Sequence, residues 1–320
     1  TFSVTYDIAP EKFCADAALA RKTSAHFATE HHEFTITGQD VVDNMEKVVH
    51  HLDEPVSNAT QVSTYLLAKH TRNHVVVGLG GDGGDELFGG YERYRFSRFM
   101  SRFQHLPEPL RRMLVTSLVR FGRGKAKKLV ARPGLERYMA FMAQGEDEVS
   151  RLLLPAVNQS AAPARAYEQF FTDAIPDSEK QLMWADIRSW LVDESLLRTD
   201  KMTMAWGLEQ RVPILDYRLV ELSLRIPTAW KIRGREGKVI FKEAMREYLP
   251  DHVLHQPKRG WFSPASEWLR CDLKEMAYEV LSPGYAPGTE AIFDFAVVRQ
   301  MLDEHIGKDA YHLNLLWAVM

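Results

Sequence analysis

A glycine-rich segment with three carboxylates carries the clearest chemical signal in this sequence of 320 residues. Asp82, Asp85 and Glu86 fall within five positions, and residues 80, 81, 83 and 84 are all glycine. Because glycine has no Cβ, the backbone amides of such a loop can approach a ligand closely. The carboxylates can hold Mg²⁺, which bridges phosphate oxygens, and one carboxylate remains to orient or deprotonate a substrate. The segment therefore predicts a loop that handles a phosphorylated ligand.

A dinucleotide-binding turn is a weaker interpretation of the same loop. Gly78, Gly80 and Gly83 satisfy the spacing Gly-x-Gly-x-x-Gly that is typical of such turns. The loop carboxylates would, however, repel a pyrophosphate, and residues 99–102 lack the acidic side chain that binds a ribose about 20 residues after the motif. The charges thus argue against a dehydrogenase.

Two further interpretations explain less of the pattern. Residues 80–88 fit one copy of the nonapeptide of calcium-binding β-rolls, but that structure buries its core only by stacking tandem copies. A polar surface turn accounts for the glycines, but not for three carboxylates directly followed by Leu87 and Phe88. A magnesium-binding and phosphate-binding loop is the hypothesis that accounts for all of these residues.

Phosphate bound beside carboxylates requires a cationic side chain from elsewhere in the chain, because negative charge develops on the leaving group. Lys238 follows Gly237 and is predicted to open a helix whose buried side consists of Val239, Ile240, Phe241 and Ala244. A second basic segment, residues 257–262, contains Lys258. A lone lysine on a helix usually faces solvent, so the pattern alone leaves a surface role for Lys238 open.

The segments that must position these residues alternate between strand and helix patterns. Strands are predicted at residues 1–6, 33–37 and 74–79, with helices at 9–26, 40–52 and 63–71. Strands separated by helices form a parallel sheet with helices on its faces. The glycine-rich loop directly follows the third strand, at the sheet edge where ligands bind in such folds.

The strand pattern nearly vanishes after Tyr94, and leucine, methionine and tryptophan then recur at helical spacing between prolines. We therefore predict an α/β fold with a parallel sheet and flanking helices over residues 1–95, and a carboxyl-terminal, mainly helical lobe over residues 96–320. The α/β part is expected to bind the nucleotide.

Composition excludes several classes of protein. The 40 basic and 43 acidic residues give a net charge of −3, which is too neutral for a protein whose main partner is bulk nucleic acid or an anionic membrane surface. The two cysteines, Cys14 and Cys271, exclude a disulfide framework and a Cys-rich zinc site, and they indicate a cytoplasmic location. No stretch approaches the roughly 20 apolar residues that a membrane helix needs.

The loop and four other segments together resemble the asparagine synthetase family. Residues 80–91 are similar to the family signature Ser-Gly-(Glu/Asp)-Gly-x-Asp-Glu-x-Phe-Gly-Gly-Tyr. The other matching segments follow in the same order as in the family, from one end of the chain to the other: residues 52–55, 200–216, 237–238 and 257–262. The match is therefore more specific than a single short motif.

The resemblance implies an ATP-pyrophosphatase-type fold, similar to the adenine nucleotide alpha-hydrolases, and ATP-dependent amide formation. In that reaction the side-chain carboxylate of aspartate attacks the α-phosphate of ATP, which gives β-aspartyl-AMP and pyrophosphate, and ammonia then displaces AMP to give asparagine. The implied cofactors are ATP and Mg²⁺. The implied partners are aspartate or a related carboxylate and a glutaminase domain that delivers ammonia; the resemblance leaves open a homodimer, and whether glutamine or free ammonia supplies the nitrogen.

Residue by residue, the resemblance implies catalytic roles for Asp82, in adenylate formation and ammonia attack, and for Lys238, in stabilising charge on phosphate and on the tetrahedral intermediate. Asp85 matches the carboxylate that binds Mg²⁺ and pyrophosphate. The other nucleotide-binding positions that it implies are Val4 (the adenine contact), Gly80, Gly81 and Lys258.

Glu209 and Arg211 lie two residues apart beside Pro213. They either reach the substrate or pair with each other for structural reasons, and of these we predict substrate contact.

The sequence departs from the family pattern in three ways. Gly80 replaces the usual serine, and Asp82 is the shorter of the two acids found there. The family's pyrophosphate loop, Ser-Gly-Gly-x-Asp-Ser, precedes the strand that here begins at Thr1, so the first strand and its loop are missing. The glutaminase domain, which begins with a catalytic cysteine, is also missing, and Cys14 cannot replace that cysteine. We therefore expect a carboxyl-terminal fragment that is inactive alone.

Alternative functions remain open at this point. Related enzymes that close β-lactam rings place a tyrosine where Asp82 stands, so Asp82 favours amidation of a separate substrate. Another acceptor, such as a polysaccharide sugar acid, is compatible with the sequence. A degenerate nucleotide-binding or scaffold module that only binds partners is the alternative from a different class.

Overall fold

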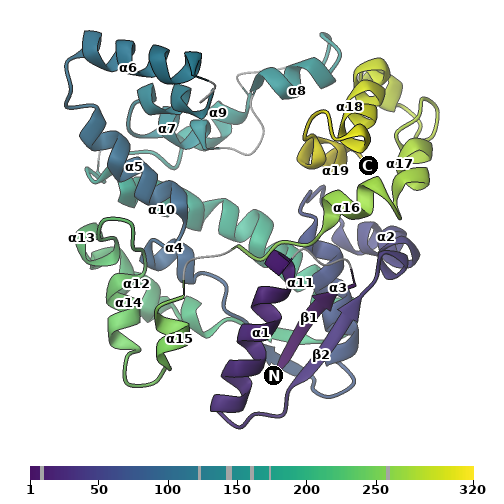
Figure 1. Cartoon of the computed structure of the whole chain (residues 1–320), viewed down its shortest axis with the longest axis horizontal. Helices are drawn as coiled ribbons and strands as arrows, with labels where there is room; N and C mark the ends of the chain where they lie inside the picture. The colour runs from purple at the N-terminus through teal and green to yellow at the C-terminus, as the bar shows by residue number, and fades with distance from the viewer. Residues whose placement is uncertain (8–10, 122–123, 142–145, 159–161, 173, 257–259) are drawn as a thin grey trace.

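Four short strands form two separate parallel sheets in the computed structural model (Figure 1). The model describes residues 1–7, 11–121, 124–141, 146–158, 162–172, 174–256 and 260–320. Strand β1 (Phe2–Tyr6) pairs with β2 (His32–Ile36), and β3 (Val77–Leu79) pairs with β4 (Glu209–Arg211). The predicted α/β class and parallel pairing are confirmed, but the single sheet that we expected is divided into two within the described residues.

Strand β4 was not predicted, because the sequence Glu-Gln-Arg has none of the apolar alternation that indicates a strand. Its backbone pairs with β3, so a segment from the helical part of the chain contributes to the sheet beside the glycine-rich loop. The predicted strand at 74–79 is also shorter than expected and begins at Val77. Tertiary pairing therefore assigned a strand where local pattern gave no signal.

Helices α1 (Glu11–His26) and α3 (Thr60–Thr71) pack against the β1–β2 pair, and α2 (Gly38–Leu52) packs against α3. Helix α2 begins with a capping box, in which the Thr37 side chain accepts from the Asp40 backbone and the Asp40 side chain accepts from the Thr37 backbone. Helix α3 is anchored to β1 by the Tyr6 hydroxyl, which donates to Ser63 at 3.1 Å. The predicted helices at 9–26, 40–52 and 63–71 correspond to these three: α2 and α3 begin earlier than predicted, and the predicted start of the first helix at residues 9–10 lies outside the described residues.

The remaining helices lie on either side of this centre in Figure 1. The middle of the chain forms α4 (Gly84–Phe88), α5 (Glu92–Phe103), α6 (Glu108–Arg120), η1 (Gly124–Val130), α7 (Leu135–Ala140), α8 (Glu146–Leu152), α9 (Ala162–Glu168), α10 (Ser178–Arg188), η2 (Trp190–Leu196), α11 (Leu197–Met204), η3 (Pro213–Leu215), α12 (Tyr217–Arg225), α13 (Thr228–Lys231), α14 (Val239–Ala244) and α15 (Asp251–Leu254). Most of these helices lie on the left of the view, whereas α8 and α11 lie nearer the middle. The carboxyl-terminal part forms α16 (Ala265–Arg270), α17 (Lys274–Val280), η4 (Thr289–Ala291), α18 (Phe295–Gly307) and α19 (Leu313–Val319), and its α-helices lie on the right.

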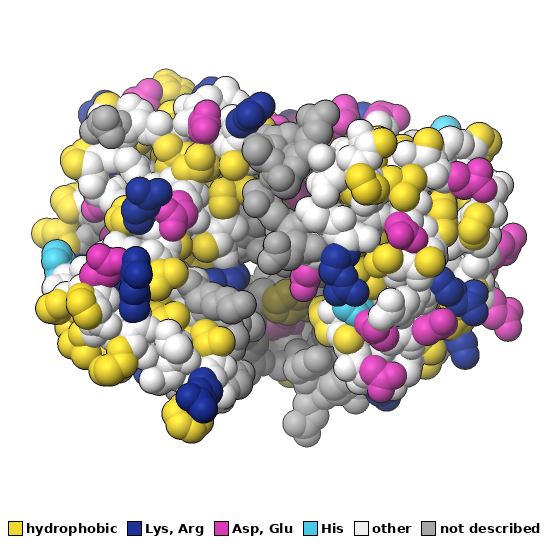
Figure 2. Space-filling model, turned by 90° about the horizontal axis from the view of Figure 1, so that it is seen from above, with side chains coloured by type: hydrophobic (Ala, Val, Ile, Leu, Met, Phe, Trp, Pro, Cys, Tyr) yellow, Lys and Arg dark blue, Asp and Glu magenta, His cyan; other side chains and the backbone are white. Residues whose placement is uncertain are grey.

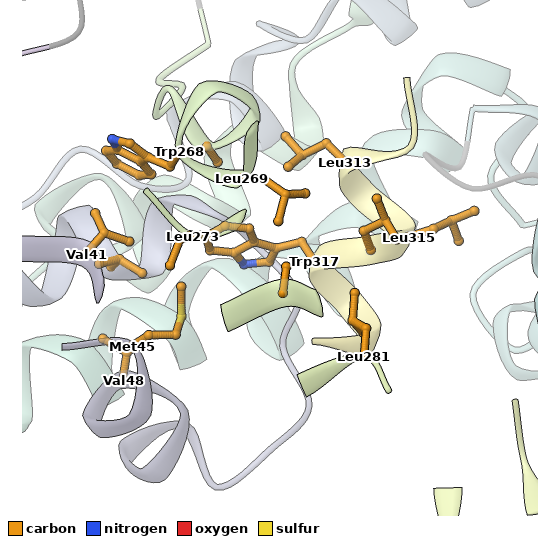
Figure 3. Close-up of a cluster of buried hydrophobic side chains, with 14 of the residues drawn as sticks. Val41, Met45, Val48, Trp268, Leu269, Leu273, Leu281, Leu313, Leu315 and Trp317 are labelled. Carbon is orange, nitrogen blue, oxygen red and sulfur yellow. The ribbon is translucent and has the colours of Figure 1, made fainter. Parts of the chain in front are cut away.

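The largest hydrophobic core joins α2 to the carboxyl-terminal helices. Val41, Met45 and Val48 recur at helical spacing along one face of α2 and are all buried. They face Trp268 of α16 and Trp317 of α19 across a continuous apolar cluster (Figure 3). At about 25 cal/mol per Å² of buried apolar surface, the burial of two tryptophans and their neighbours stabilises the contact between α2 and the carboxyl-terminal helices.

On the face that Figure 2 shows, acidic and basic side chains are interspersed, and neither charge forms a large continuous area. This agrees with the net charge of −3. In the parts of the chain that the structure describes, none of the helices combines the length and the apolar character that crossing a membrane requires.

Candidate active site

The glycine-rich loop leaves the carboxyl end of β3 and turns directly into helix α4. The Gly80 amide donates to the carbonyl oxygen of Arg211 at 2.8 Å, which extends the pairing with β4 by one residue. The chain then turns at Gly83, which has a φ of 87° in the left-handed region. A Cβ at this position would also lie 2.2 Å from the Leu215 side chain. The loop is thus fixed between β4 and the segment that follows it.

Lys238 reaches this loop from a distant part of the sequence. Its ammonium nitrogen lies 3.1 Å from Oδ1 of Asp85, and the two side chains are 26% and 17% exposed. The Lys238 amide donates to the carbonyl oxygen of Phe88 at 3.0 Å, and the Phe88 and Phe241 rings stack with centroids 4.7 Å apart. These contacts dock the start of α14 on the end of α4. The structure therefore brings together the two residues for which the sequence implied phosphate and metal chemistry.

Glycines make this close approach feasible. A Cβ on Gly237 would lie 2.3 Å from the carbonyl oxygen of Gly89, so only glycine lets the two backbones meet. A Cβ on Gly90 would lie 1.8 Å from Oδ1 of Asp85 and 2.4 Å from Cε of Lys238. The glycine pair at the end of α4 and the glycine before Lys238 are therefore structural requirements of the ion pair.

The helix that Lys238 opens is confirmed as α14, but its predicted buried face is only partly correct. Val239, Ile240 and Phe241 are half-buried, whereas Ala244 is exposed. Lys238 itself precedes the helix with a φ of 57°. The helix ends after six residues, and Ala244 at its end is not covered by the segments that cover Val239, Ile240 and Phe241 at its start.

Asp82 is held by two side chains that the sequence analysis did not identify. The Ser195 hydroxyl donates to Oδ1 at 3.0 Å, and the Gln210 side-chain amide donates to Oδ2 at 3.1 Å. Ser195 lies in the π-helix η2, and Gln210 is the central residue of β4. Neither position carries a motif that indicates chemistry. The only available signal was that both lie within or just before the family-like segment at 200–216.

Glu86, the third acidic residue of the loop, faces the protein interior. It is only 2% exposed, and the Tyr91 hydroxyl donates to its Oε1 at 2.6 Å. Burial raises the pKa of Glu86, although the hydrogen bond from Tyr91 opposes that shift. Of the three carboxylates that we expected at a ligand site, Asp82 and Asp85 are therefore the accessible ones.

A buried polar cluster around Asp186 is connected to the loop through Tyr91. Asp186 of α10 accepts from Arg93 of α5 at 3.0 Å and from the Tyr138 hydroxyl at 2.9 Å, and the Tyr94 hydroxyl also donates to it. The Arg93 guanidinium lies 4.2 Å from the centre of the Tyr91 ring. Because the Tyr91 hydroxyl also donates to Glu86, this cluster connects α5 and α10 to the end of the loop.

Glu209 and Arg211 pair with each other at 2.8 Å and are 56% and 64% exposed. Successive residues of a strand point to opposite faces, so both lie on the face of β4 opposite to Gln210. They therefore lie on the other side of the strand from the contact with Asp82. Their predicted contact with a substrate stays a prediction.

The other predicted nucleotide contacts are dispersed. Val4 lies in the β1–β2 sheet, opposite Phe34, and packs against the largest core. Gly81 is exposed, and a Cβ added there would meet open space. Lys258 lies outside the described residues. The structure thus brings Gly80, Asp82, Asp85 and Lys238 together, while Val4 belongs to the other sheet.

A cavity of about 540 Å³ opens beside Lys238 between α1, α14 and α15. Three further basic side chains line it, Arg95, Arg235 and Lys242, together with the acidic Glu236, which pairs with Lys242 at 2.9 Å. This volume lies in the range of small-molecule sites. The cavity and the ion pair at its edge form the candidate active site.

The carboxylates fit a magnesium ion that is held mainly by its substrate. No group of three or more His, Cys, Asp or Glu side chains in the described part of the chain could enclose a metal. Mg²⁺ commonly binds through one or two carboxylates together with substrate phosphates. Asp85, which is partly exposed at the rim beside Lys238, meets that requirement as a single protein ligand.

Comparison with known proteins gives one consistent result. The family model for asparagine synthase matches residues 1–320. Asparagine synthetase [glutamine-hydrolyzing] 1 of Bacillus subtilis is 29% identical over 325 residues, which cover 100% of this chain and 50% of that protein. Asparagine synthetase [glutamine-hydrolyzing] 3 of Bacillus subtilis is 27% identical and covers 84% of this chain, and the corresponding protein 1 of Saccharomyces cerevisiae is 26% identical and covers 83%. The chain spans about half the length, or less, of these curated relatives.

Proposed function

Since this chain belongs to the asparagine synthase family, we propose that it forms the synthetase part of an enzyme that amidates aspartate at the expense of ATP. The reaction passes through β-aspartyl-AMP, takes ammonia from glutamine, and yields asparagine, AMP and pyrophosphate. ATP and Mg²⁺ are the cofactors. The family match covers the whole chain, and the site geometry gives the physical reason to extend the activity to it.

The observation that carries this proposal is the ion pair between Lys238 and Asp85 at the end of the glycine-rich loop. A cation and a carboxylate 3.1 Å apart form a mixed site, in which the ammonium binds phosphate oxygens directly and the carboxylate binds them through Mg²⁺. A dehydrogenase or a calcium-binding β-roll has no use for this pairing. Asp82, three residues before Asp85 in the loop, accepts hydrogen bonds from the neutral side chains of Ser195 and Gln210.

The chain's own residues divide the chemistry as follows. Lys238 stabilises the negative charge that develops on the α-phosphate and pyrophosphate oxygens while the aspartate carboxylate attacks phosphorus. Asp85 holds Mg²⁺, which when bound neutralises pyrophosphate charge. Asp82 orients the incoming ammonia and accepts the proton that its nitrogen loses as the new carbon–nitrogen bond forms and AMP leaves. Val4 and Lys258 complete the nucleotide contacts.

We further propose that sequence outside residues 1–320 completes the nucleotide site. No Ser-Gly-Gly-x-Asp-Ser loop occurs within these residues, although the family resemblance implies one. Within the described part of the chain, β1 pairs only with β2 and β3 only with β4, so each pair has an edge that could accept another strand. Leu79, in β3, and Val76, just before it, are 75% and 56% exposed, as expected for a strand whose faces are not covered. Residues 1–320 alone should therefore be inactive.

The proposed activity predicts a defined product pattern. Protein from the full reading frame, supplied with MgATP, aspartate and either glutamine or ammonium chloride, should form asparagine, AMP and pyrophosphate in equal amounts, measured by mass spectrometry. Residues 1–320 expressed alone serve as the comparison and should form none of them. Pyrophosphate release by the short chain would refute the proposed need for further sequence.

A panel of acceptors tests the substrate. Aspartate, glutamate and a uronic acid should be compared at equal concentration, because no described residue excludes a related carboxylate by shape. AMP formation with a sugar acid and not with aspartate would replace asparagine synthesis by amidation of that acid. No AMP formation with any acceptor, combined with retained ATP binding, would favour a binding module instead.

A further inference from the structure

We propose that Ser195 and Gln210 are positioning residues that hold the Asp82 carboxylate in the orientation needed for amide formation. This inference rests on the proposed function for its kinetic consequence, but its geometric content stands on the hydrogen bonds alone. The two donors come from η2 and β4, which lie on different parts of the chain, and each binds a different carboxylate oxygen. Together they fix both the position and the plane of the carboxylate.

Both donors are neutral, which distinguishes Asp82 from its neighbour. Asp85 is paired with the Lys238 ammonium, which cancels much of its charge. A serine hydroxyl and a glutamine amide orient a carboxylate through single hydrogen bonds and leave its negative charge in place. Within the described part of the chain Asp82 forms no ion pair, so its carboxylate can attract the hydrogens of ammonia and accept a proton from it.

The π-helix η2 places Ser195 beside Asp82. The Leu197 amide donates to the carbonyl oxygens of Val192, five residues earlier, and Glu194, three residues earlier, and not to the α-helical partner four residues earlier. This wider turn changes which side chains face the loop, and Ser195 is one of its buried residues, only 9% exposed. Such π-turns occur often at functional sites. Here the irregular turn has an identifiable result, which is a buried hydroxyl directed at Asp82.

Gly80 gives Gln210 the space to reach Asp82. A Cβ on Gly80 would lie 2.0 Å from Nε2 of Gln210, the same atom that donates to Asp82. Any larger residue at position 80 would push the glutamine amide away from the carboxylate. Gly80 and Gln210 therefore act together on Asp82, which accounts for the glycine that replaces the serine of the family signature.

The test compares Ser195→Ala and Gln210→Ala in full-length protein with Ser195→Thr, which retains the hydroxyl. Each alanine variant should lower kcat for amide formation roughly tenfold, the effect of one lost hydrogen bond to a charged group, while KM for ATP stays within about twofold because phosphate contacts are intact. Ser195→Thr should recover most of the rate. Ser223→Ala removes another buried hydroxyl, bonded to the Val220 carbonyl, and should leave kcat unchanged.

Gly80→Ser supplies an independent variant. It should lower kcat as Gln210→Ala does. The double variant Gly80→Ser/Gln210→Ala should be no slower than either single variant, because both changes break the same hydrogen bond between Gln210 and Asp82. Additive losses, or unchanged kcat in both alanine variants, would overturn the positioning role.

A crystal structure of the Ser195→Ala/Gln210→Ala protein decides the question even if the parent protein makes no amide. A rotated or disordered Asp82 carboxylate supports the inference, and an unmoved one refutes it. Absence of activity in the parent would instead count against the proposed function alone.

Discussion

Replacement of Lys238 by alanine in the full-length protein is expected to lower aspartate-dependent ATP–pyrophosphate exchange by about 10²–10³-fold, the usual loss for one group that stabilises transition-state charge. Lys238 is the cation that lies 3.1 Å from Asp85, and its backbone is fixed to Phe88. Its removal leaves the pyrophosphate charge without that partner. The exchange assay isolates this step, because it requires adenylate formation but no ammonia.

Arg246→Ala is the matched control for this prediction. Arg246 lies two residues after α14, outside the lining of the cavity, and forms an exposed ion pair with Glu243 of α14, so its removal also deletes one positive charge near Lys238. Exchange should fall less than about threefold in this variant, since an exposed pair contributes little. Lys238→Arg should recover only part of the rate, because a planar guanidinium does not reproduce the compact charge that the lysine ammonium places 3.1 Å from Asp85. Full exchange in Lys238→Ala would remove this residue from the site.

The second large effect is expected for Asp85→Asn, which keeps the shape of the side chain but removes its charge. Exchange should fall by about 10²–10³-fold at low Mg²⁺, and higher Mg²⁺ should recover part of it, because the amide is a weaker ligand for a hard cation. The variant also leaves Lys238 without its carboxylate partner. Activity measured across a magnesium titration therefore separates loss of metal binding from a general loss of structure.

Asp303→Asn provides the control for the loss of one carboxylate. Asp303 accepts from Tyr278 at 2.6 Å and lies on α18, in the carboxyl-terminal part of the molecule. Its replacement should leave both the exchange rate and its magnesium dependence unchanged. An Asp85→Asn protein with the same magnesium dependence as the parent would show that Asp85 is no ligand of the metal.

Much of the fold near the loop was predictable because its signals are local. Apolar runs located β1, β2 and β3, and the spacing of apolar residues located α1, α2 and α3. The glycines and carboxylates at residues 80–86 marked the loop, since few other functions explain that composition. Lys238 was found by its position after glycine and by resemblance, and the structure gave that prediction its physical basis in the contact with Asp85.

The rest of the site depends on contacts between distant segments, which local pattern does not encode. Strand β4 is three polar residues that become a strand only because β3 offers them a partner. Ser195 faces Asp82 because η2 has the wider π-helical turn, and no residue type specifies that turn in advance. Glu86 looked equivalent to Asp85 in sequence, and only its burial against Tyr91 separates the two.

The fate of the substrate oxygen tests the central claim most directly. Full-length protein should be supplied with MgATP, ammonium chloride and aspartate that carries oxygen-18 in its side-chain carboxylate. If the carboxylate attacks the α-phosphate and ammonia then displaces AMP, each asparagine formed leaves one labelled oxygen in AMP, which mass spectrometry detects. Label in inorganic phosphate, with ADP as the other product, or AMP without label would contradict an adenylate intermediate and with it the proposed function of this site.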